Sequence, residues 1–276
     1  MSPNPNRPPH TALLALALAT CGALPVWAGP IPDDLVRAEL IGGWPTKGGY
    51  MAALRLTLAP GWKTYWRAPG EAGIPPDFDW RASSNLADVT YHWPAPQVFE
   101  VSGLRTLGYH DALVLPIEFS RLSPDQSLQI SGQINLGVCK DICVPAQVDV
   151  TATLSGAGTN SAAIKAALAR APQEGRAAGI GPAQCRADPT RDGLRLTVDM
   201  PLKGAATGDF AVVELTDKRV WVSAVESRAG DGHLVQVSDL VPPDAQPFGL
   251  NRSSVRLTIF TVSGAVYELL GCTGQE

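Results

Sequence analysis

The sequence has no cluster of basic residues and no basic stretch interleaved with aromatic residues. Charged residues make up only 17% of the chain, and the net charge is −4. Nucleic-acid binding therefore has little support. Beyond one apolar run near the N-terminus, no stretch approaches the length needed to cross a bilayer, so we expect no transmembrane helix. Apolar residues still make up 45% of the chain, which is enough for packed cores in two modest domains.

The N-terminus indicates export. The apolar run Ala12–Ala19 is followed by a small-x-small-like end at Val26–Ala28. This pattern predicts a secretory signal peptide at residues 1–28, and the run is too short to span a bilayer. A lipoprotein, with Cys21 as the lipid-bearing residue, is the alternative. In both cases Cys21 does not take part in pairing.

The mature chain then holds four cysteines: Cys139, Cys143, Cys185 and Cys272. An even count in an exported chain suits an oxidising compartment. Three pairings are possible, and the simplest joins Cys139 to Cys143 and Cys185 to Cys272. A loop of about 90 residues gives a disulfide roughly 4.6 kcal/mol of stabilisation, against about 2 kcal/mol for a five-residue loop. We therefore predict that the long Cys185–Cys272 bridge is structural and that the short Cys139–Cys143 bridge is reversibly reduced.

The spacing of Cys139 and Cys143 favours a turn between two strands. Residues i and i+4 of a helix have Cβ atoms roughly 5–6 Å apart, whereas a disulfide needs about 3.5–4.5 Å. Directly opposed strand residues come closer. Strand-like runs at Gln129–Val138 and Val144–Leu154 flank the pair, which puts Lys140–Ile142 at the tip. We interpret the pair as a reversible dithiol/disulfide.

The rest of the chain predicts an all-β protein of two β-sandwich domains. Short runs with period-2 alternation lie between turns rich in glycine and proline. Pro116 suggests an edge strand or a bulge. The predicted strands are Ala38–Ile41, Leu54–Leu58, Val89–Trp93, Leu113–Phe119, Gln129–Val138, Val144–Leu154, Leu194–Val198, Phe210–Leu215, Trp221–Val225, His233–Val237, Val255–Val262 and Ala265–Leu270.

A change in amino-acid composition marks the domain boundary. Residues 155–161 have the composition of a flexible linker, and Ser161–Arg170 predicts a short alanine-rich helix with a serine cap. We therefore divide the mature chain into a first sandwich (29–156), a linker with a short helix (157–182) and a second sandwich (183–276).

The chain contains five distinctive motifs: Gly61–Pro76, Trp93–Pro96, Gly108–Tyr109, Leu115–Pro116 and Cys139–Pro145. Together they resemble the N-terminal periplasmic domain of the thiol:disulfide interchange protein DsbD, in particular its ScsB-like branch. The resemblance covers Leu35–Leu154 with good specificity and the second half only loosely.

The resemblance implies immunoglobulin-like sandwiches and a thiol–disulfide oxidoreductase of the periplasm. Cys139 and Cys143 would be the catalytic pair, with Cys143 meeting the downstream partner. Electrons would come from a membrane-embedded thiol donor and pass to thioredoxin-like periplasmic proteins. No cofactor, metal, nucleic acid or small-molecule substrate is implied. The pathway stays open between disulfide isomerisation, cytochrome c biogenesis and defence against copper or oxidants.

In the family, aromatic residues and a cap loop shield the active sulfurs. On matching positions, Trp62 and Tyr65 are the neighbouring aromatics. The cap is expected within Phe99–Tyr109, with Phe99 or Leu104 as the covering side chain. Two features depart from the pattern. The cysteines are closer together than in the best-known members, and the usual membrane-spanning domain is missing, so we expect a separate protein to supply the electrons.

Three other interpretations compete. Both disulfides could be structural, in an exported β-sandwich that acts as a scaffold or binding module. Two thiolates could bind Zn²⁺ or Cu(I), but structural zinc normally has four ligands, and His92 and His110 are not at a ligand-like spacing. A cysteine hydrolase needs a histidine beside the nucleophile, and nothing in the sequence places one beside Cys143.

Overall fold

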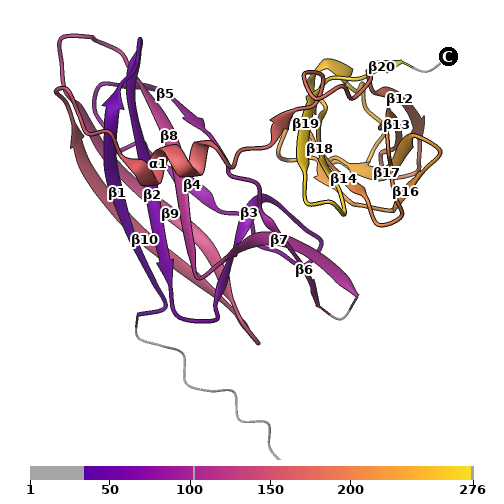
Figure 1. Cartoon of the computed structure of the whole chain (residues 1–276), viewed down its shortest axis with the longest axis horizontal. Helices are drawn as coiled ribbons and strands as arrows, with labels where there is room; N and C mark the ends of the chain where they lie inside the picture. Colours follow the sequence, from indigo (N-terminus) through magenta and orange to yellow (C-terminus); the bar gives the residue numbers. More distant parts are fainter. Residues whose placement is uncertain (1–33, 102, 275–276) are drawn as a thin grey trace, which may run out of the picture. The chain divides into compact units, whose positions relative to one another are not determined.

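The computed structural model describes residues 34–101 and 103–274. The predicted signal peptide (1–28) and Cys21 lie outside these residues. Within the described residues, twenty strands form four sheets, and one short α-helix and one 3₁₀ turn accompany them (Figure 1). The prediction of an all-β fold is confirmed. No helix in the described ranges is long and apolar enough to cross a membrane.

The first sandwich consists of a four-stranded and a six-stranded sheet. The four-stranded sheet has the order β1-β2-β8-β5. The six-stranded sheet has the order β10-β9-β3-β7-β6, and β4 also pairs with β9. The strands are β1 (Val36–Pro45), β2 (Gly49–Leu58), β3 (Lys63–Gly70), β4 (Asp77–Asp79), β5 (Leu86–Tyr91), β6 (Gln97–Val101), β7 (Leu104–His110), β8 (Ala112–Arg121), β9 (Leu128–Cys139) and β10 (Cys143–Leu154).

Alternation along the strands builds the core of the first sandwich. In β9, the side chains of Leu128, Ile130, Ile134, Leu136 and Val138 are all buried, and each is separated from the next by one or three residues. Period-2 spacing places these side chains on one face of the sheet. They pack against apolar residues of β2 and β8 in one cluster. The opposite face of the six-stranded sheet is therefore free to carry a site.

The expectation for Pro116 is wrong. β8 lies between β2 and β5 rather than at an edge, and the β2–β8 register is continuous through Ala53 and Pro116. Proline is tolerated there because β5 ends at Tyr91, opposite Ile117. The next residue, His92, still donates its N–H to the Pro116 carbonyl. The N–H that proline lacks would face the point where β5 leaves the sheet.

The helix predicted in the linker packs on the first sandwich. α1 (Ala162–Leu168) begins after Ser161, whose side chain accepts a hydrogen bond from the Ile164 N–H. Ile164 is fully buried in a small cluster with Met51 and Ala53 of β2. Figure 1 shows α1 lying across β2 and β8. The segment after the first sandwich is thus anchored to it by Ile164, with Leu168 packed against the same cluster.

The second sandwich has a four-stranded sheet of order β11-β19-β18-β14 and a six-stranded sheet of order β15-β17-β13-β12-β20, in which β16 also pairs with β17. The expected strand Trp221–Val225 shortens to two residues, and the turn at Ser263–Gly264 separates β18 from β19. The strands are β11 (Gln173–Glu174), β12 (Gln184–Pro189), β13 (Leu194–Pro201), β14 (Phe210–Glu214), β15 (Trp221–Val222), β16 (Glu226–Gly230), β17 (His233–Val241), β18 (Arg256–Phe260), β19 (Val266–Leu270) and β20 (Thr273–Gly274).

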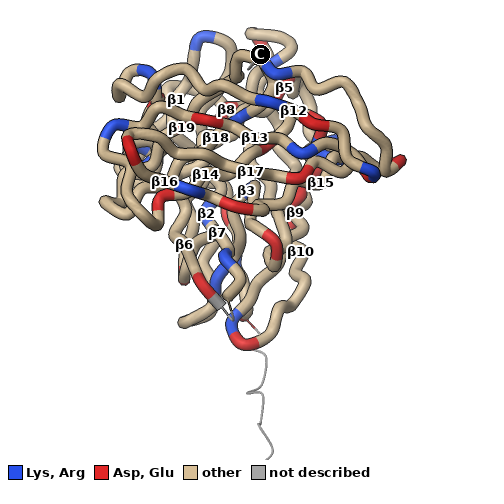
Figure 2. The backbone as a smooth tube through the Cα atoms, turned by 90° about the vertical axis from the view of Figure 1, so that its right-hand side faces the viewer, with Lys and Arg blue, Asp and Glu red and all other residues tan. Residues whose placement is uncertain are grey.

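Charge is spread along the chain. Basic and acidic positions are interspersed over the described backbone, as Figure 2 shows. Several of the ion pairs among the described residues join exposed side chains that are close in the sequence, such as Arg37 with Asp34 and Arg219 with Asp217. Pairs of this kind contribute little to stability.

Candidate functional site

The two closely spaced cysteines end one strand and begin the next. β9 ends at Cys139 and β10 begins at Cys143, and the two residues are directly opposed in the antiparallel register. Their Cα atoms are 4.1 Å apart, and their sulfurs form a disulfide. The Lys140 N–H donates to the Ile142 carbonyl at 3.0 Å, which closes the turn. The predicted turn is therefore present, with Lys140–Ile142 at its tip.

The two sulfur-bearing residues differ in exposure. Cys139 is 1% exposed, whereas Cys143 belongs to the exposed class. The difference follows from the fold, because Cys139 lies beside β3 in the interior of the sheet and Cys143 begins the edge strand β10. An incoming thiolate can therefore reach Cys143 Sγ but not Cys139 Sγ.

The disulfide lies on the outer face of the six-stranded sheet. Val138 points into the core, so its neighbour Cys139 points the other way. Lys63 on β3 is directly opposite Cys139, and directly opposed residues share a face. Tyr65, two residues further along β3, lies on that face as well. Strand periodicity alone thus brings a lysine and a tyrosine to the cysteine pair.

Tyr65 contacts both sulfurs. Its hydroxyl donates to Cys139 Sγ at 3.1 Å and lies 3.5 Å from Cys143 Sγ. The side chain is buried, and this burial raises the pKa of the phenol above its ordinary value of 10.0. The hydroxyl is therefore protonated at neutral pH and can donate a hydrogen bond to sulfur.

The loop after β3 folds back over this face. A Cβ on Gly73 would lie 2.9 Å from the Tyr65 ring, and a Cβ on Gly137 would lie 2.8 Å from the Ile74 Cβ. Both glycines therefore permit close packing that a larger residue would block. Ile74 itself is 42% exposed, so the loop borders the site with an apolar side chain that faces solvent.

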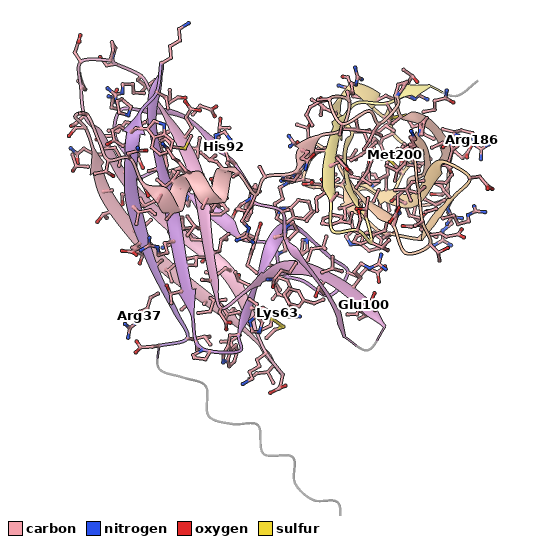
Figure 3. All side chains as sticks on the ribbon, in the orientation of Figure 1. Arg37, Lys63, His92, Glu100, Arg186 and Met200 are labelled. Atoms are coloured by element: carbon pink, nitrogen blue, oxygen red, sulfur yellow. A yellow bond between two sulfur atoms is a disulfide. The ribbon has the colours of Figure 1, made fainter. Side chains whose placement is uncertain are left out.

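The expected cap is a β-hairpin of two strands, β6 and β7. β7 pairs with β3 and holds the hairpin at the same end of the sandwich as the β9–β10 turn (Figure 1). Phe99 on β6 is half-buried, and its ring centroid lies 4.7 Å from Lys63 Nζ. Figure 3 shows Lys63 beside the disulfide. Phe99 is thus connected to the cysteine pair through Lys63.

The remaining predicted shielding residues lie elsewhere. Trp62 and Tyr109 are 7% and 4% exposed and belong to the core of the first sandwich. The Tyr109 hydroxyl donates to the Pro94 carbonyl at 2.7 Å, and its ring stacks on Trp93. Leu104 is 43% exposed at the start of β7. Of the five predicted residues, the structure places Tyr65 against the sulfurs and Phe99 one contact away.

Lys63 is the site residue that the sequence reasoning missed. The signal was its position two residues before Tyr65, because alternation along one strand puts both side chains on one face. The charged residues and the proline within Lys63–Gly70 hide the strand in the sequence, so this alternation could not be used.

The other cysteine pair lies in the second sandwich. Cys185 on β12 is fully buried, and its sulfur bonds to Cys272 just after β19, across a Cα–Cα distance of 5.8 Å. The bond closes a sequence separation of 87 residues and belongs to the second core. Cys272 is half-buried, so the bridge is enclosed on the Cys185 side.

Within residues 34–101 and 103–274, no group of three or more histidine, cysteine or acidic side chains could hold a metal ion. His110 Nδ1 lies 2.8 Å from Asp111 Oδ2, and His92 Nε2 lies 3.9 Å from Glu118 Oε2. In the described part of the chain, no hydrogen bond joins either ring to Cys143, so the geometry supplies no general base for a cysteine hydrolase.

The arrangement suits thiol–disulfide exchange. An external thiolate that attacks Cys143 Sγ breaks the bond to Cys139 Sγ, which leaves as a thiolate. The Tyr65 hydroxyl is already placed to donate a hydrogen bond to that leaving sulfur. Such hydrogen bonds to a charged acceptor are among the strong ones in proteins.

Comparisons with known proteins agree with this chemistry. Residues 38–155 match the family model described as thiol:disulfide interchange protein DsbD, N-terminal. The structure is similar to the crystal structure of the N-terminal periplasmic domain of ScsB from Proteus mirabilis, with a TM-score of 0.62 and 23% sequence identity. The match covers 87% of this chain and 92% of that one. At this identity the likeness shows the fold, which is the predicted pair of immunoglobulin-like sandwiches. The comparison with curated protein sequences found no match.

Proposed function

Because residues 38–155 of this chain belong to the family of the N-terminal domain of the thiol:disulfide interchange protein DsbD, we propose that the chain relays electrons through Cys139 and Cys143. The protein is exported to the periplasm and takes two electrons from a membrane-embedded thiol donor. It then reduces thioredoxin-like periplasmic proteins. The sulfur pair carries the electrons, so no cofactor takes part.

The exposure of Cys143 at the sheet edge, together with the Tyr65 hydroxyl that contacts both sulfurs, is the observation that carries the proposal. Unequal burial alone does not mark a redox pair, because the Cys185–Cys272 bridge also joins a fully buried cysteine to a half-buried one. In a relay, the accessible Cys143 forms the mixed disulfide with each partner, and the protected Cys139 resolves the one with the acceptor. The hydrogen bond from Tyr65 to Cys139 supports this division, because it stabilises the leaving group.

The cycle balances in two steps. A donor thiolate attacks Cys143 Sγ, which forms a mixed disulfide and frees Cys139 as a thiolate. The second thiolate of the donor then attacks the donor sulfur that is bonded to Cys143. The donor becomes a disulfide, and Cys143 is released as a thiolate. The pair has gained two electrons. The same steps in reverse, with Cys143 attacking the disulfide of the acceptor, pass those electrons on.

A redox titration of the full mature chain tests the proposal. The protein is equilibrated in glutathione buffers, the free thiols are alkylated, and each cysteine pair is quantified by peptide mass. The Cys139–Cys143 bond should equilibrate with the glutathione buffers. The reduction potential of glutathione lies above the roughly −300 mV that is typical of structural disulfides, so only a redox-active bond should respond. Cys185–Cys272 serves as the internal control and should remain oxidised. If both bonds resist millimolar glutathione, the chain is a scaffold with structural disulfides.

A second experiment separates the roles of the two sulfurs. Cys139→Ala and Cys143→Ala are each mixed with a thioredoxin domain that keeps one active-site cysteine, activated with thionitrobenzoate. Attack by a free thiolate releases the coloured thionitrobenzoate and traps the mixed disulfide. Cys139→Ala should react readily through the exposed Cys143, and Cys143→Ala should react far more slowly. Equal rates would refute the assignment of Cys143 as the attacking residue.

A further inference from the structure

The strand β10 has a free edge, and its first residue is the exposed Cys143. Among the described strands, β10 pairs with β9 alone, so its other side has no neighbour (Figure 1). A strand edge presents a row of backbone N–H and C=O groups with which another chain can pair. The accessible sulfur of the site therefore lies at the start of an edge that can accept a further strand.

The register of the hairpin decides which backbone groups of β10 point to this edge. The Lys140 N–H donates to the Ile142 carbonyl at 3.0 Å, which makes these two a hydrogen-bonded pair. Pairs alternate along an antiparallel ladder, so the next pair, Cys139 and Cys143, exchanges no backbone hydrogen bonds. Their Cα–Cα distance of 4.1 Å agrees, because non-hydrogen-bonded pairs are the closer ones. The N–H and C=O of Cys143 therefore point to the free edge.

Pro145 fits the same alternation. It lies opposite Gly137, two positions further along the ladder, so the N–H that it lacks would also face the free edge. The Gly137 carbonyl accepts a hydrogen bond from Thr64 Oγ1 at 3.0 Å and thus points toward β3 rather than toward β10. Proline is tolerated at such an edge position because no ladder bond is lost. Along the free edge, Cys143 offers a donor and an acceptor, whereas Pro145 offers an acceptor alone.

The mixed disulfide of the relay brings a partner backbone to this edge. A disulfide holds the Cα atoms of its two residues about 4.4–6.8 Å apart, so the partner backbone must come this close to Cys143. Directly opposed residues of a hydrogen-bonded strand pair are about 5.5 Å apart, which lies within that range. A partner that is extended at its cysteine or beside it can therefore form the disulfide and pair with the Cys143 backbone at the same time.

We propose that the thioredoxin-like acceptor docks by strand addition, with an extended segment whose backbone exchanges two hydrogen bonds with the N–H and C=O of Cys143. The inference rests on the proposed function and adds to it how the partner is recognised. Main-chain hydrogen bonds supply the affinity in this kind of recognition. Because Pro145 withholds the next donor, the paired stretch stays short, which allows the partner to leave after exchange.

A second copy of this chain is the rival occupant of the edge. Two β10 strands that pair with each other need a run of donors along both edges, and Pro145 interrupts that run in each copy. A redox partner needs no more than the donor and the acceptor at Cys143. The edge therefore favours the redox partner over self-association.

Amide hydrogen exchange, read residue by residue by NMR, tests the docking mode. In the free chain, the Cys143 and Gln147 amides should exchange fast, because they face the edge. The Val144 and Ala146 amides face β9 and should exchange slowly. Cys139→Ala is then trapped as a mixed disulfide with the thionitrobenzoate-activated thioredoxin domain. Exchange of the Cys143 amide should slow about two- to twelve-fold in this adduct, the effect of one hydrogen bond.

The control for this measurement is the mixed disulfide of Cys139→Ala with cysteamine. Cysteamine has no peptide backbone, so exchange of the Cys143 amide should stay fast. Equal exchange in the thioredoxin and cysteamine adducts would overturn the proposal, and so would a slow Cys143 amide in the free chain. Should Cys139→Ala fold poorly by circular dichroism, Cys139→Ser replaces it, and the same slowing is required.

Pro145→Val supplies the N–H that the edge lacks. In the Cys139→Ala background it should slow the release of the thioredoxin domain by dithiothreitol about two- to twelve-fold, because one further hydrogen bond holds the segment. Thr151→Val is the matched control, since it introduces valine on the same exposed face of β10 without adding an N–H. Release from Thr151→Val should match that from Cys139→Ala alone. Equal release from Pro145→Val and Thr151→Val would refute strand addition.

The outcomes separate this inference from the proposed function. If the wild-type disulfide equilibrates with glutathione but the Cys143 amide is unprotected in the thioredoxin adduct, the relay stands and strand addition is wrong. If the disulfide resists glutathione, the relay is wrong and the inference falls with it. Sedimentation of the wild-type chain should give a monomer. A dimer in which the Cys143 amide is protected would assign the edge to a second copy, against the proposal.

Discussion

The substitution Tyr65→Phe removes the hydroxyl that contacts both sulfurs of the site disulfide. The ring and its packing remain, and only the hydroxyl that lies 3.1 Å from Cys139 Sγ is lost. In the disulfide that hydroxyl faces a weak sulfur acceptor, whereas in the reduced pair it faces a much stronger thiolate acceptor. The substitution should therefore harm the reduced state and the transition state more than the oxidised state.

The size of the effect follows from ordinary hydrogen-bond energies. A hydrogen bond to a charged group contributes about 1.5–3 kcal/mol. About half of the thiolate charge has developed in the transition state of exchange, so roughly 0.7–1.5 kcal/mol of barrier is at stake. Each 1.36 kcal/mol is a factor of ten in rate, so reduction of the disulfide should slow by about 3- to 12-fold. The reduction potential should fall by about 30–60 mV.

The assay combines the glutathione titration with a rate measurement. The rate is that at which dithiothreitol reduces the Cys139–Cys143 bond in the full mature chain, measured by acid quench and peptide mass. Tyr109→Phe is the matched control, because it removes a buried hydroxyl from the same sandwich, on the core face, where that hydroxyl donates to the Pro94 carbonyl at 2.7 Å. Tyr109→Phe should lower the melting temperature and leave both redox values at the wild-type level. Tyr65→Phe should change the redox values and leave the melting temperature nearly unchanged.

One result would refute the reasoning. If the disulfide of Tyr65→Phe is reduced at the wild-type rate and has the wild-type reduction potential, the hydroxyl does not stabilise the leaving sulfur. Cys139 would then leave without help, and its burial would be its main distinction from Cys143.

The pH dependence of the Tyr65 effect follows from its pKa. A phenol is neutral below its pKa, and burial raises the pKa of Tyr65 above 10.0, which extends the neutral range upward. The hydroxyl therefore remains a donor throughout pH 6–9. The ratio of wild-type to Tyr65→Phe reduction rates should be constant over that range. A ratio that falls between pH 7 and pH 9 would mean that the phenol ionises there, against the direction of the shift.

Two further substitutions test the fold around the site. Replacing Cys185 and Cys272 with alanine should lower the free energy of unfolding by about 4–5 kcal/mol in urea titration and leave the exchange rate of the site disulfide unchanged. Gly108→Ala places a Cβ where it overlaps the Thr64 carbonyl oxygen. This should separate β7 from β3 and destabilise the protein by about 1–3 kcal/mol. Gly42→Ala, at a position with open space, is the control and should leave the stability unchanged.

The local features of this protein could be predicted from the sequence. Alternation over runs such as Leu54–Leu58 predicted the strands, and the Cys139–Cys143 spacing predicted a turn between two of them, because both depend on neighbours in the chain. Phe99–Tyr109 was expected to be a loop, since its weak alternation hid the strands β6 and β7. The prediction for Pro116 was wrong for a related reason. The sequence shows that proline lacks a backbone N–H, but it does not show which strand lies beside the proline.

Only the tertiary structure decided which residues face the sulfurs. Tyr65 and Tyr109 both lie in motifs that carry the family resemblance, and the sequence could not show which of them faces the sulfurs. The pairing of β3 with β9 and β7 puts Tyr65 on the outer face, and Tyr109 packs in the core. Long-range register fixes this choice, since a shift of one residue turns every side chain of a strand to the opposite face. The same register makes Cys139 buried and leaves Cys143 exposed at the sheet edge.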